Sequence, residues 1–299
     1  MGVLPNQPVH LVARCMLEAR LRAVWFRLPL AAEKSAEDVE HVHQLRVATR
    51  RAVASMRLFS ALIPDEICSD IRATLRRIRL AADQARNWDV LSDMFLHCPD
   101  VSGAGVVCTI VEEIARRRQA AQQPLVAVYR ELLGEEYHER IERLLAGLPS
   151  AGKHEAKQDF GRHARAYFKT VLKKFSQAAA ADLSDDEALH RFRICTKKIR
   201  YTMEMVAVAF EPTFRKELYP QVSLLQDILG IVNDHAMGKV FFHDWSLRAH
   251  EAQEKAFLEG LVLAEARAQR DVRQAFFALW TPKSVAELLR QFDLHGGLS

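Results

Sequence analysis

The chain has 299 residues, of which 49% are hydrophobic and 27% are charged, and its formal net charge is +4. This composition is typical of a folded protein with a substantial core, in one large domain or two of ordinary size. The five cysteines are scattered and form no C-x-x-C pair, which argues against a disulfide framework and a zinc knuckle. No apolar run approaches a membrane span and the N-terminus has no signal-peptide pattern, so we expect a cytoplasmic protein.

Nearly every segment has helical periodicity, and β-branched runs of strand length are absent. We therefore predict an all-α fold. Proline sets some of the expected ends: the first helix should stop near Pro29, Pro124 should kink or break the fourth, and Thr281 should cap the last one, with proline following it. Helices are predicted over approximately residues 8–28, 35–62, 64–97, 106–148, 155–180, 184–210, 212–245, 247–279 and 281–292.

Capping boxes and one linker complete the predicted organisation. Two helices should begin at capping boxes, Ser-x-x-Asp at 35–38 and Ser-x-x-Glu at 184–187. The stretch 147–152 is rich in Gly, Pro and Ser and lies at the midpoint of the sequence, which makes it the best linker candidate. Long antiparallel helices with short connections form four-helix bundles. We predict two such bundles, an N-terminal half over residues 1–149 and a C-terminal half over residues 150–299.

The two halves contain a matching stretch. The residues HQLRVATRR from His43 align with HRFRICTKK from His190 at an offset of 147 residues, and the same offset pairs Met56 with Met203. We interpret this register as an internal duplication. Two related bundles should pack about a pseudo-two-fold axis, with the matching faces either meeting in a shared groove or facing opposite ways.

Each copy places cationic residues on one helical face, at intervals of three and four residues. These stripes consist of His43, Arg46, Arg50 and Arg57 in the first copy and of His190, Arg193, Lys197 and Arg200 in the second. Within the two helices, the acidic residue that neighbours a cationic stripe is Glu204, at the end of the second stripe. We therefore expect no internal counter-ion and an anion supplied from elsewhere. The next helix of the first half carries another basic row, which would face the first stripe across a groove: Arg72, Arg76, Arg79 and Arg86.

Signals for a metal site or for catalysis are weak. His41 and His43 are two residues apart and so point to different sides of a helix, with cations around them. There is no P-loop, no G-x-G-x-x-G and no H-E-x-x-H, and clustered carboxylates that could hold magnesium are missing. Further basic faces at 116–118, 169–174 and 267–273 are interpreted first as solvated surface, and their contribution to a basic groove stays open. We expect no catalytic residues, no metal and no cofactor.

The pattern H-x-x-R-V-x-x-R-R in the first half, with H-x-x-R-I-x-x-K-K-x-R-Y in the second, resembles the CHAD domain, the conserved histidine α-helical domain. The resemblance implies two four-helix halves and a basic groove that binds inorganic polyphosphate. Carried over by motif, the contacts would be His43, Arg46, Arg50, Arg51, His190, Arg193, Lys197, Lys198, Arg200 and Tyr201. Leu229-Gly230-x-x-Asn233-Asp234 resembles a second motif of the family.

The first half departs from the family pattern. It has Val53 where the second copy has Arg200, and Ala82-Asp83-x-x-Arg86-Asn87 where the family has L-G-x-x-R-D. This leaves two alternatives. Either the first half binds less tightly, or Arg57 and the row of Arg72, Arg76 and Arg79 supplement it.

We predict a non-enzymatic module that binds inorganic polyphosphate, with polyphosphate granules as a candidate location. The alternatives are a metal-dependent phosphohydrolase acting on polyphosphate, a single-strand nucleic-acid-binding protein and a histidine metal chelator. Specific nucleic-acid binding is disfavoured because only Phe59 lies near the first stripe, whereas such proteins interleave aromatic and basic residues. The oligomeric state stays open.

Overall fold

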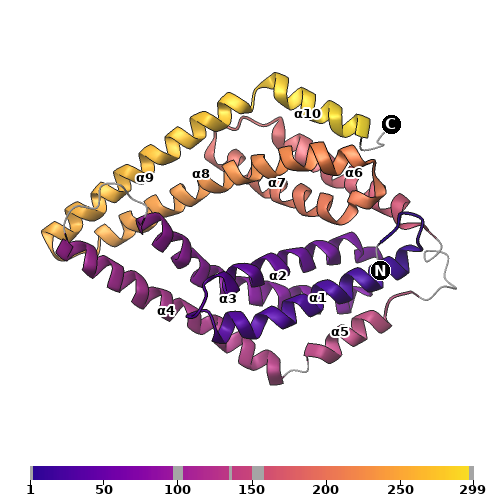
Figure 1. The fold of residues 1–299 in the computed structure, drawn as a ribbon, viewed down its shortest axis with the longest axis horizontal. Coiled ribbons are helices and arrows are strands. Elements are labelled where there is room, and N and C mark those ends of the chain that lie inside the picture. Colours follow the sequence, from indigo (N-terminus) through magenta and orange to yellow (C-terminus); the bar gives the residue numbers. More distant parts are fainter. Residues whose placement is uncertain (1–2, 97–103, 135–136, 150–157, 296–299) are drawn as a thin grey trace. The chain divides into compact units, whose positions relative to one another are not determined.

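The computed structural model describes residues 3–96, 104–134, 137–149 and 158–295 (Figure 1). Within these ranges every regular element is a helix, apart from one isolated β-bridge between Pro8 and Asp159, so the all-α prediction is confirmed. The α-helices are α1 (Val9–Glu33), α2 (Glu40–Leu58), α3 (Asp65–Leu96), α4 (Ala104–Gly134), α5 (Tyr137–Ala146), α6 (Phe160–Ala179), α7 (Asp186–Val206), α8 (Tyr219–Ser246), α9 (Ala252–Leu279) and α10 (Pro282–His295). Short 3₁₀ turns follow α2 (η1, Ser60–Leu62) and α7 (η3, Ala207–Ala209), and a π-turn (η4, Phe214–Leu218) precedes α8.

The chain divides into two compact units. Unit 1 comprises Met1–Asp89 and Ile114–Tyr167, and unit 2 comprises Val90–Glu113 and Phe168–Ser299. These units are defined by contacts, so α3, α4 and α6 each contribute to both of them. The predicted halves 1–149 and 150–299 were defined by the sequence repeat instead and stay a prediction.

Unit 1 is built around α1, which packs against α2 and α5. The amphipathic α5 turns Tyr137 and Ile141 inward, and the ring of Tyr137 stacks on that of Trp25 with 5.1 Å between the centroids. On α2 the apolar side faces the core, which leaves the cationic stripe on the neighbouring, more exposed side of the helix. The buried positions of α2 are Val42, Leu45, Ala48, Thr49, Ala52, Ser55, Met56 and Leu58.

Unit 2 has an aromatic core. Phe168 lies 5.1 Å from Phe214 and 5.8 Å from Phe292 between ring centroids, and Phe175 lies 5.4 Å from Phe192. These rings join α6, α7, η4 and α10. The helices α7, α8 and α9 pack in sequence, α8 being the central one. This arrangement positions one face of α7 and α8 for the site described below.

Local features recur at the offset of 147 residues. Thr49 in α2 and Thr196 in α7 are both buried, and each donates its hydroxyl to the carbonyl four residues earlier, at 2.8 and 2.9 Å. Ser55 and Thr202 make the same type of bond to Arg51 O and Lys198 O. The 3₁₀ turns η1 and η3 also correspond at this offset. A duplication would produce these recurrences, and they justify comparing residues of the two copies at this offset.

Pro29 does not end the first helix, contrary to expectation, and Pro124 does not break the fourth; that Pro124 kinks its helix stays a prediction. Pro29 lies inside α1, which continues to Glu33, and Pro124 lies inside α4, which continues to Gly134. Burial of Ala31 and Ala32 explains the first case, because packing of the last turn outweighs one missing hydrogen bond. The predicted fourth helix is instead divided into α4 and α5.

Both predicted capping boxes were wrong in detail. Helix α2 begins at Glu40, five residues after Ser35, and the Asp38 carboxylate accepts a hydrogen bond from the Glu40 N–H at 2.8 Å. At α7 the cap is Asp185, not Ser184, and it accepts from Ala188 N at 2.7 Å. Aspartate and serine are both good N-cap residues, so the spacing of the capping-box residues could not distinguish Ser184 from the adjacent Asp185. Thr281 does accept from Ser284 N at the start of α10, as predicted.

The predicted linker and several other helix ends can also be compared with the structure. Helix α5 ends at Ala146, directly before the predicted linker, and the Gly147 N–H still donates to Arg143 O. Residues 150–152 lie outside the described residues. Helix α9 begins at Ala252, later than expected. The segment from Thr213 starts as the π-turn η4, which buries both Phe214 and Leu218.

A buried ion pair joins α3 to α4 in unit 1. The Nε of Arg118 donates to Oδ1 of Asp89, whose side chain is 3% exposed. Arg118 also donates to Gln122, and the Gln122 amide in turn donates to Ala31 O at 2.7 Å and Ala32 O at 3.2 Å. The pair therefore supports the end of α1 through Gln122.

Replacing Asp89 by Ala should lower the free energy of unfolding by about 2–4 kcal/mol, because it leaves the Arg118 guanidinium group buried without its carboxylate. Urea unfolding followed by circular dichroism would measure this. The exposed ion pair between Glu287 and Arg290 provides the control, and Glu287→Ala should leave the urea midpoint unchanged. Equal effects of the two substitutions would contradict a supporting role for the buried pair.

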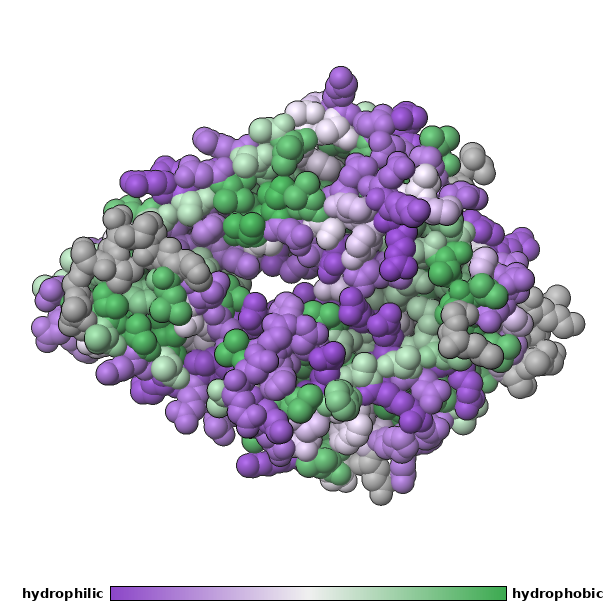
Figure 2. All heavy atoms as spheres, in the orientation of Figure 1, coloured by the Kyte–Doolittle hydropathy of each residue, from purple (hydrophilic) through white to green (hydrophobic). Residues whose placement is uncertain are grey.

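On the face shown in Figure 2, hydrophilic residues surround the exposed hydrophobic ones in both units. Such a mixture is ordinary for a protein surface in water. Among the described helices, none combines the length and the apolar character needed to cross a bilayer.

Candidate functional site

In unit 1 the predicted cationic residues of α2 and α3 come together because the two helices run antiparallel. Arg46 contacts Asp83, whereas Arg57, further along α2, shares the neighbour Tyr167 with Arg72, which lies earlier on α3. Moving forward along α2 therefore means moving back along α3. This is the pairing that the sequence predicted for the stripe and the basic row.

Arg46 has a carboxylate partner, so the expectation that the stripe lacks an internal counter-ion was wrong at this position. Its Nη1 lies 2.6 Å from Oδ1 of Asp83, and Nη1 of Arg79 lies 4.0 Å from Oδ2 of the same carboxylate. The side chains of Arg46 and Asp83 are 16% and 29% exposed. The spacing along α2 could not reveal this partner because Asp83 belongs to a different helix.

One carboxylate does not balance the positive charge around Arg46. Burial is the main cause that lowers the pKa of Arg46 to about 10, and Arg50, Arg86 and Arg79 lower it further, while Asp83 opposes them. The Nε of Arg46 is buried and has no hydrogen-bond partner. A lowered pKa for a guanidinium group means that its charged form is disfavoured here. An external anion would relieve that cost.

His43 belongs to the same group. Its pKa is lowered from the ordinary value of 6.5, first by burial and then by the positive charge of Arg86, with smaller contributions from Arg50 and Arg46. Glu40 opposes this shift. We call the group of His43, Arg46, Arg50, Arg79 and Arg86, with Asp83 among them, the unit 1 cluster.

Further along the same pair of helices, Arg57 and Arg72 lie near Tyr167 of α6. Burial raises the pKa of the Tyr167 hydroxyl, and the charges of Arg57 and Arg72 lower it in part. Arg57, Arg72 and Arg76 are exposed, and Arg51 is half-buried. Sequence reasoning missed Tyr167, because it belongs to a helix about a hundred residues away and no motif marks it.

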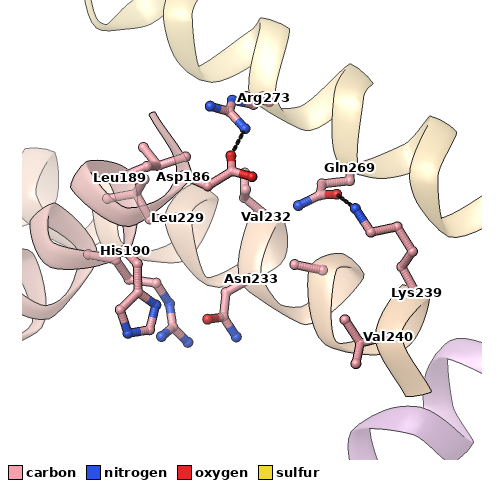
Figure 3. A pocket seen from close by; sticks show the side chains of 12 residues that line it. Asp186, Leu189, His190, Leu229, Val232, Asn233, Lys239, Val240, Gln269 and Arg273 are labelled. Atoms are coloured by element: carbon pink, nitrogen blue, oxygen red, sulfur yellow. Dashed lines mark hydrogen bonds and ion pairs between the residues drawn. The ribbon is translucent and has the colours of Figure 1, made fainter. Parts of the chain in front are cut away.

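In unit 2, His190 and Arg193 of α7 line a pocket of about 250 Å³ (Figure 3). Asn233 of the predicted second motif lines it too, from α8. The other residues of the pocket are Asp186, Leu189, Leu229, Val232, Ala236, Lys239, Val240, Gln269 and Arg273. Lys197 and Lys198 are half-buried further along α7 and do not line the pocket.

Arg200 is held by neighbours within unit 2, which corrects its expected lack of a counter-ion. Its Nε donates to Gln226 Oε1 at 2.6 Å, and its Nη1 donates to Glu204 Oε1 at 3.2 Å and to Tyr219 Oη at 3.0 Å. Its guanidinium carbon lies 4.7 Å from the centre of the Tyr201 ring, which is buried. Arg200 and Tyr201 thus have a structural role in this conformation.

The described residues contain no group of three or more His, Cys, Asp or Glu side chains arranged to hold a metal ion. Each unit thus has its own set of candidate groups: cationic groups on α2 and α3 in unit 1, and cationic and amide groups on α7, α8 and α9 in unit 2. Such groups bind anions, and arginine is especially suited to phosphate oxygens because its planar fork donates two hydrogen bonds at once.

Comparison with known families identifies the chain. The sequence model of the CHAD domain matches residues 15–243. The protein belongs to the CHAD domain family. The match covers both copies of the repeated stretch.

Solved structures show the same CHAD fold. The CHAD domain from the plant Ricinus communis is similar with a TM-score of 0.71 at 21% identity, covering 92% of this chain and 94% of that one. PptA from Streptomyces chartreusis is similar with a TM-score of 0.66 at 17% identity, covering 92% of this chain and 99% of that one. A comparison with curated proteins found no match.

The two copies of this CHAD chain differ in charge on the helix that follows the repeated stripe. The sequence of α3 has four arginines at helical spacing, whereas at the offset of 147 residues α8 has uncharged side chains. The corresponding pairs are Arg72 and Tyr219, Arg76 and Ser223, Arg79 and Gln226, and Arg86 and Asn233. The two alternatives for the first half, weaker binding or supplementation by these arginines, both stay predictions.

Proposed function

We propose that this CHAD protein binds inorganic polyphosphate without catalysis, and that the unit 1 cluster is the main contact surface. The observation that supports this most is the crowding of arginines around the half-buried Arg46, with Asp83 as the acidic group that acts on it most. Low-dielectric surroundings strengthen the field of such a group, and a linear polyanion would supply the missing negative charge along it. Family membership supports the same ligand through the motif residues named above.

On α7 in unit 2, His190, Arg193, Lys197 and Lys198 would add contacts to the same kind of chain. We assign less of the affinity to this face because α8 has no arginine row beside it and because Arg200 already binds Glu204 and Tyr219. Cytoplasmic location and association with polyphosphate granules are part of this proposal.

Retention on immobilised polyphosphate, measured over a salt gradient, tests the proposal. When cationic side chains neutralise the phosphates of a polyanion, the counter-ions bound to it are released into solution. Added salt opposes this release, so we expect log affinity to decrease linearly with log salt concentration. Competition with a single-stranded oligonucleotide of equal charge separates phosphate binding from nucleic-acid binding. We expect polyphosphate to compete better, because stacking partners are scarce on this face. Release of phosphate in the presence of magnesium would show that the protein is a hydrolase instead.

Binding should also depend on pH through His43. In the free protein the pKa of His43 is lowered, so the folded state disfavours its protonation and loses stability as the pH falls below the unfolded value of about 6.5. A bound polyanion would favour the imidazolium form and raise that pKa. Binding would then take up a proton.

We therefore expect the affinity for polyphosphate to rise several-fold as the pH falls from about 7.5 to about 5.5. Each unit by which binding raises the pKa of His43 can increase the affinity by about tenfold at most. Titrations at several pH values would measure it. His43→Gln should flatten the profile, whereas His10→Gln, outside the cluster, should not. A profile that is the same in all three proteins would reject the coupling to His43.

A further inference from the structure

The pocket of unit 2 combines an apolar wall with polar groups (Figure 3). Leu189 of α7 and Leu229, Val232 and Val240 of α8 supply the apolar wall. An inorganic phosphate chain is fully hydrophilic and gains nothing from contact with leucine and valine. The wall therefore points to a ligand that also has an organic part.

The two matching stretches differ in their side chains at this place. In unit 1 the position of Ala236 is occupied by Asp89, which forms the buried ion pair with Arg118. In unit 2 the residue at the position of Arg118 is Glu265, whose Oε2 lies 2.6 Å from Nδ1 of His235. At the two positions of the ion pair, unit 2 therefore has Ala236 and Glu265, and the Glu265 carboxylate contacts His235 instead. Unit 2 thus has no ion pair at the positions of Asp89 and Arg118, and the small side chain of Ala236 lines the pocket.

The charged groups of the pocket favour an anion. Asp186 accepts from Arg273, and Lys239 Nζ donates to Gln269 Oε1 at 3.1 Å. Among the residues that line the pocket, one has a carboxylate, Asp186, and three have cationic side chains, Arg193, Lys239 and Arg273. His190 and Arg193 also begin the α7 stripe, so the pocket is continuous with the surface proposed to bind phosphate.

We propose that this pocket binds a small phosphate monoester, with the organic body against the apolar wall and the phosphate at His190 and Arg193. The choice of phosphate as head group rests on the function proposed above for the α7 stripe, whereas the organic body rests on the pocket itself. The volume of about 250 Å³ limits the body to a few carbon atoms.

Hexyl phosphate, inorganic phosphate and hexanoate are suitable probes, and ligand-observed NMR with the full chain would measure their dissociation constants. We expect hexyl phosphate to bind at least tenfold more tightly than inorganic phosphate, because only the ester uses the apolar wall. We also expect it to bind more tightly than hexanoate, because Arg193 can hold two phosphate oxygens in the stripe. Equal binding of hexyl phosphate and inorganic phosphate would overturn the proposal, and equal binding of hexanoate would overturn the phosphate assignment.

Two variants test the location. Ala236→Leu adds a bulky side chain to a residue that lines the pocket, and Val240→Asp places a carboxylate in the apolar wall. Each should weaken hexyl phosphate at least tenfold. Ile231→Asp is the matched control, since Ile231 is an exposed apolar residue of α8 that does not line the pocket. Circular dichroism would confirm that all three proteins are folded.

Retention on polyphosphate distinguishes this inference from the proposed function. If the variants keep their retention and lose hexyl phosphate, both proposals stand. If hexyl phosphate binds equally to wild type, Ala236→Leu and Val240→Asp, the pocket assignment is wrong whatever the result with polyphosphate. If hexyl phosphate binding is lost in the variants but wild type is not retained on polyphosphate, only the proposed function fails.

Discussion

Replacing Arg76, Arg79 and Arg86 by Ser, Gln and Asn should weaken binding of inorganic polyphosphate by about 10- to 100-fold at near-physiological salt. These replacements are the residues that unit 2 has at the same offset, Ser223, Gln226 and Asn233, so the fold of α3 should tolerate them. The physical reason is the loss of cations from α3, two of which act directly on Arg46. The slope of log affinity against log salt should become shallower by about 2, at roughly 0.7 per lost contact.

A matched control removes the same number of charges from elsewhere. Arg248, Lys255 and Lys283 are exposed and lie outside the unit 1 cluster, and their replacement by Gln changes the net charge equally. We expect this control to reduce affinity only slightly. If both triple variants lose the same affinity, the protein binds through its overall charge and not through α3.

Asp83→Asn should destabilise the free protein and strengthen its binding to polyphosphate. Asp83 is the carboxylate that opposes the lowering of the Arg46 pKa, and its removal leaves a half-buried guanidinium group among like charges. Because the pair is partly exposed, we expect a loss of about 1–3 kcal/mol in the free energy of unfolding at low salt. Polyphosphate should restore most of this loss, because it would replace the missing negative charge.

Thermal unfolding with and without polyphosphate measures both effects at once. The polyanion should raise the melting temperature of the Asp83→Asn protein more than that of wild type. Asp271→Asn, an exposed aspartate on α9, provides the control and should change neither the stability nor the response. An Asp83→Asn protein that is destabilised but unresponsive to polyphosphate would show that Asp83 only supports the fold and that the cluster is not the binding surface.

The two matching stretches share buried hydroxyl bonds and differ in their charged side chains. The hydroxyl bonds of Thr49 and Thr196 are the same, whereas Asp89 and Arg86 correspond to Ala236 and Asn233 at the offset of 147 residues. Loss of a buried hydrogen bond costs more stability than loss of a partly exposed cation. The same local bonds are therefore compatible with an arginine cluster in unit 1 and a mixed pocket in unit 2.

The sequence by itself determined the helical class and the stripes of His43 and His190, because both depend on periodicities within a single helix. It also indicated that α3 would face α2, since a second basic row at helical spacing followed directly. Local signals placed several helix ends wrongly, as at Pro29 and Ser184, where burial or a neighbouring residue decided the outcome.

Only the tertiary structure decided which charges are already compensated. Asp83 reaches Arg46 from another helix, and Gln226 and Tyr219 reach Arg200 across the interface of α7 and α8. Tyr167 and the pocket beside Ala236 likewise depend on residues far apart in the chain. The physical reason is that electrostatic interactions and packing act through space over a few ångströms, whereas a sequence pattern orders residues only along one helix.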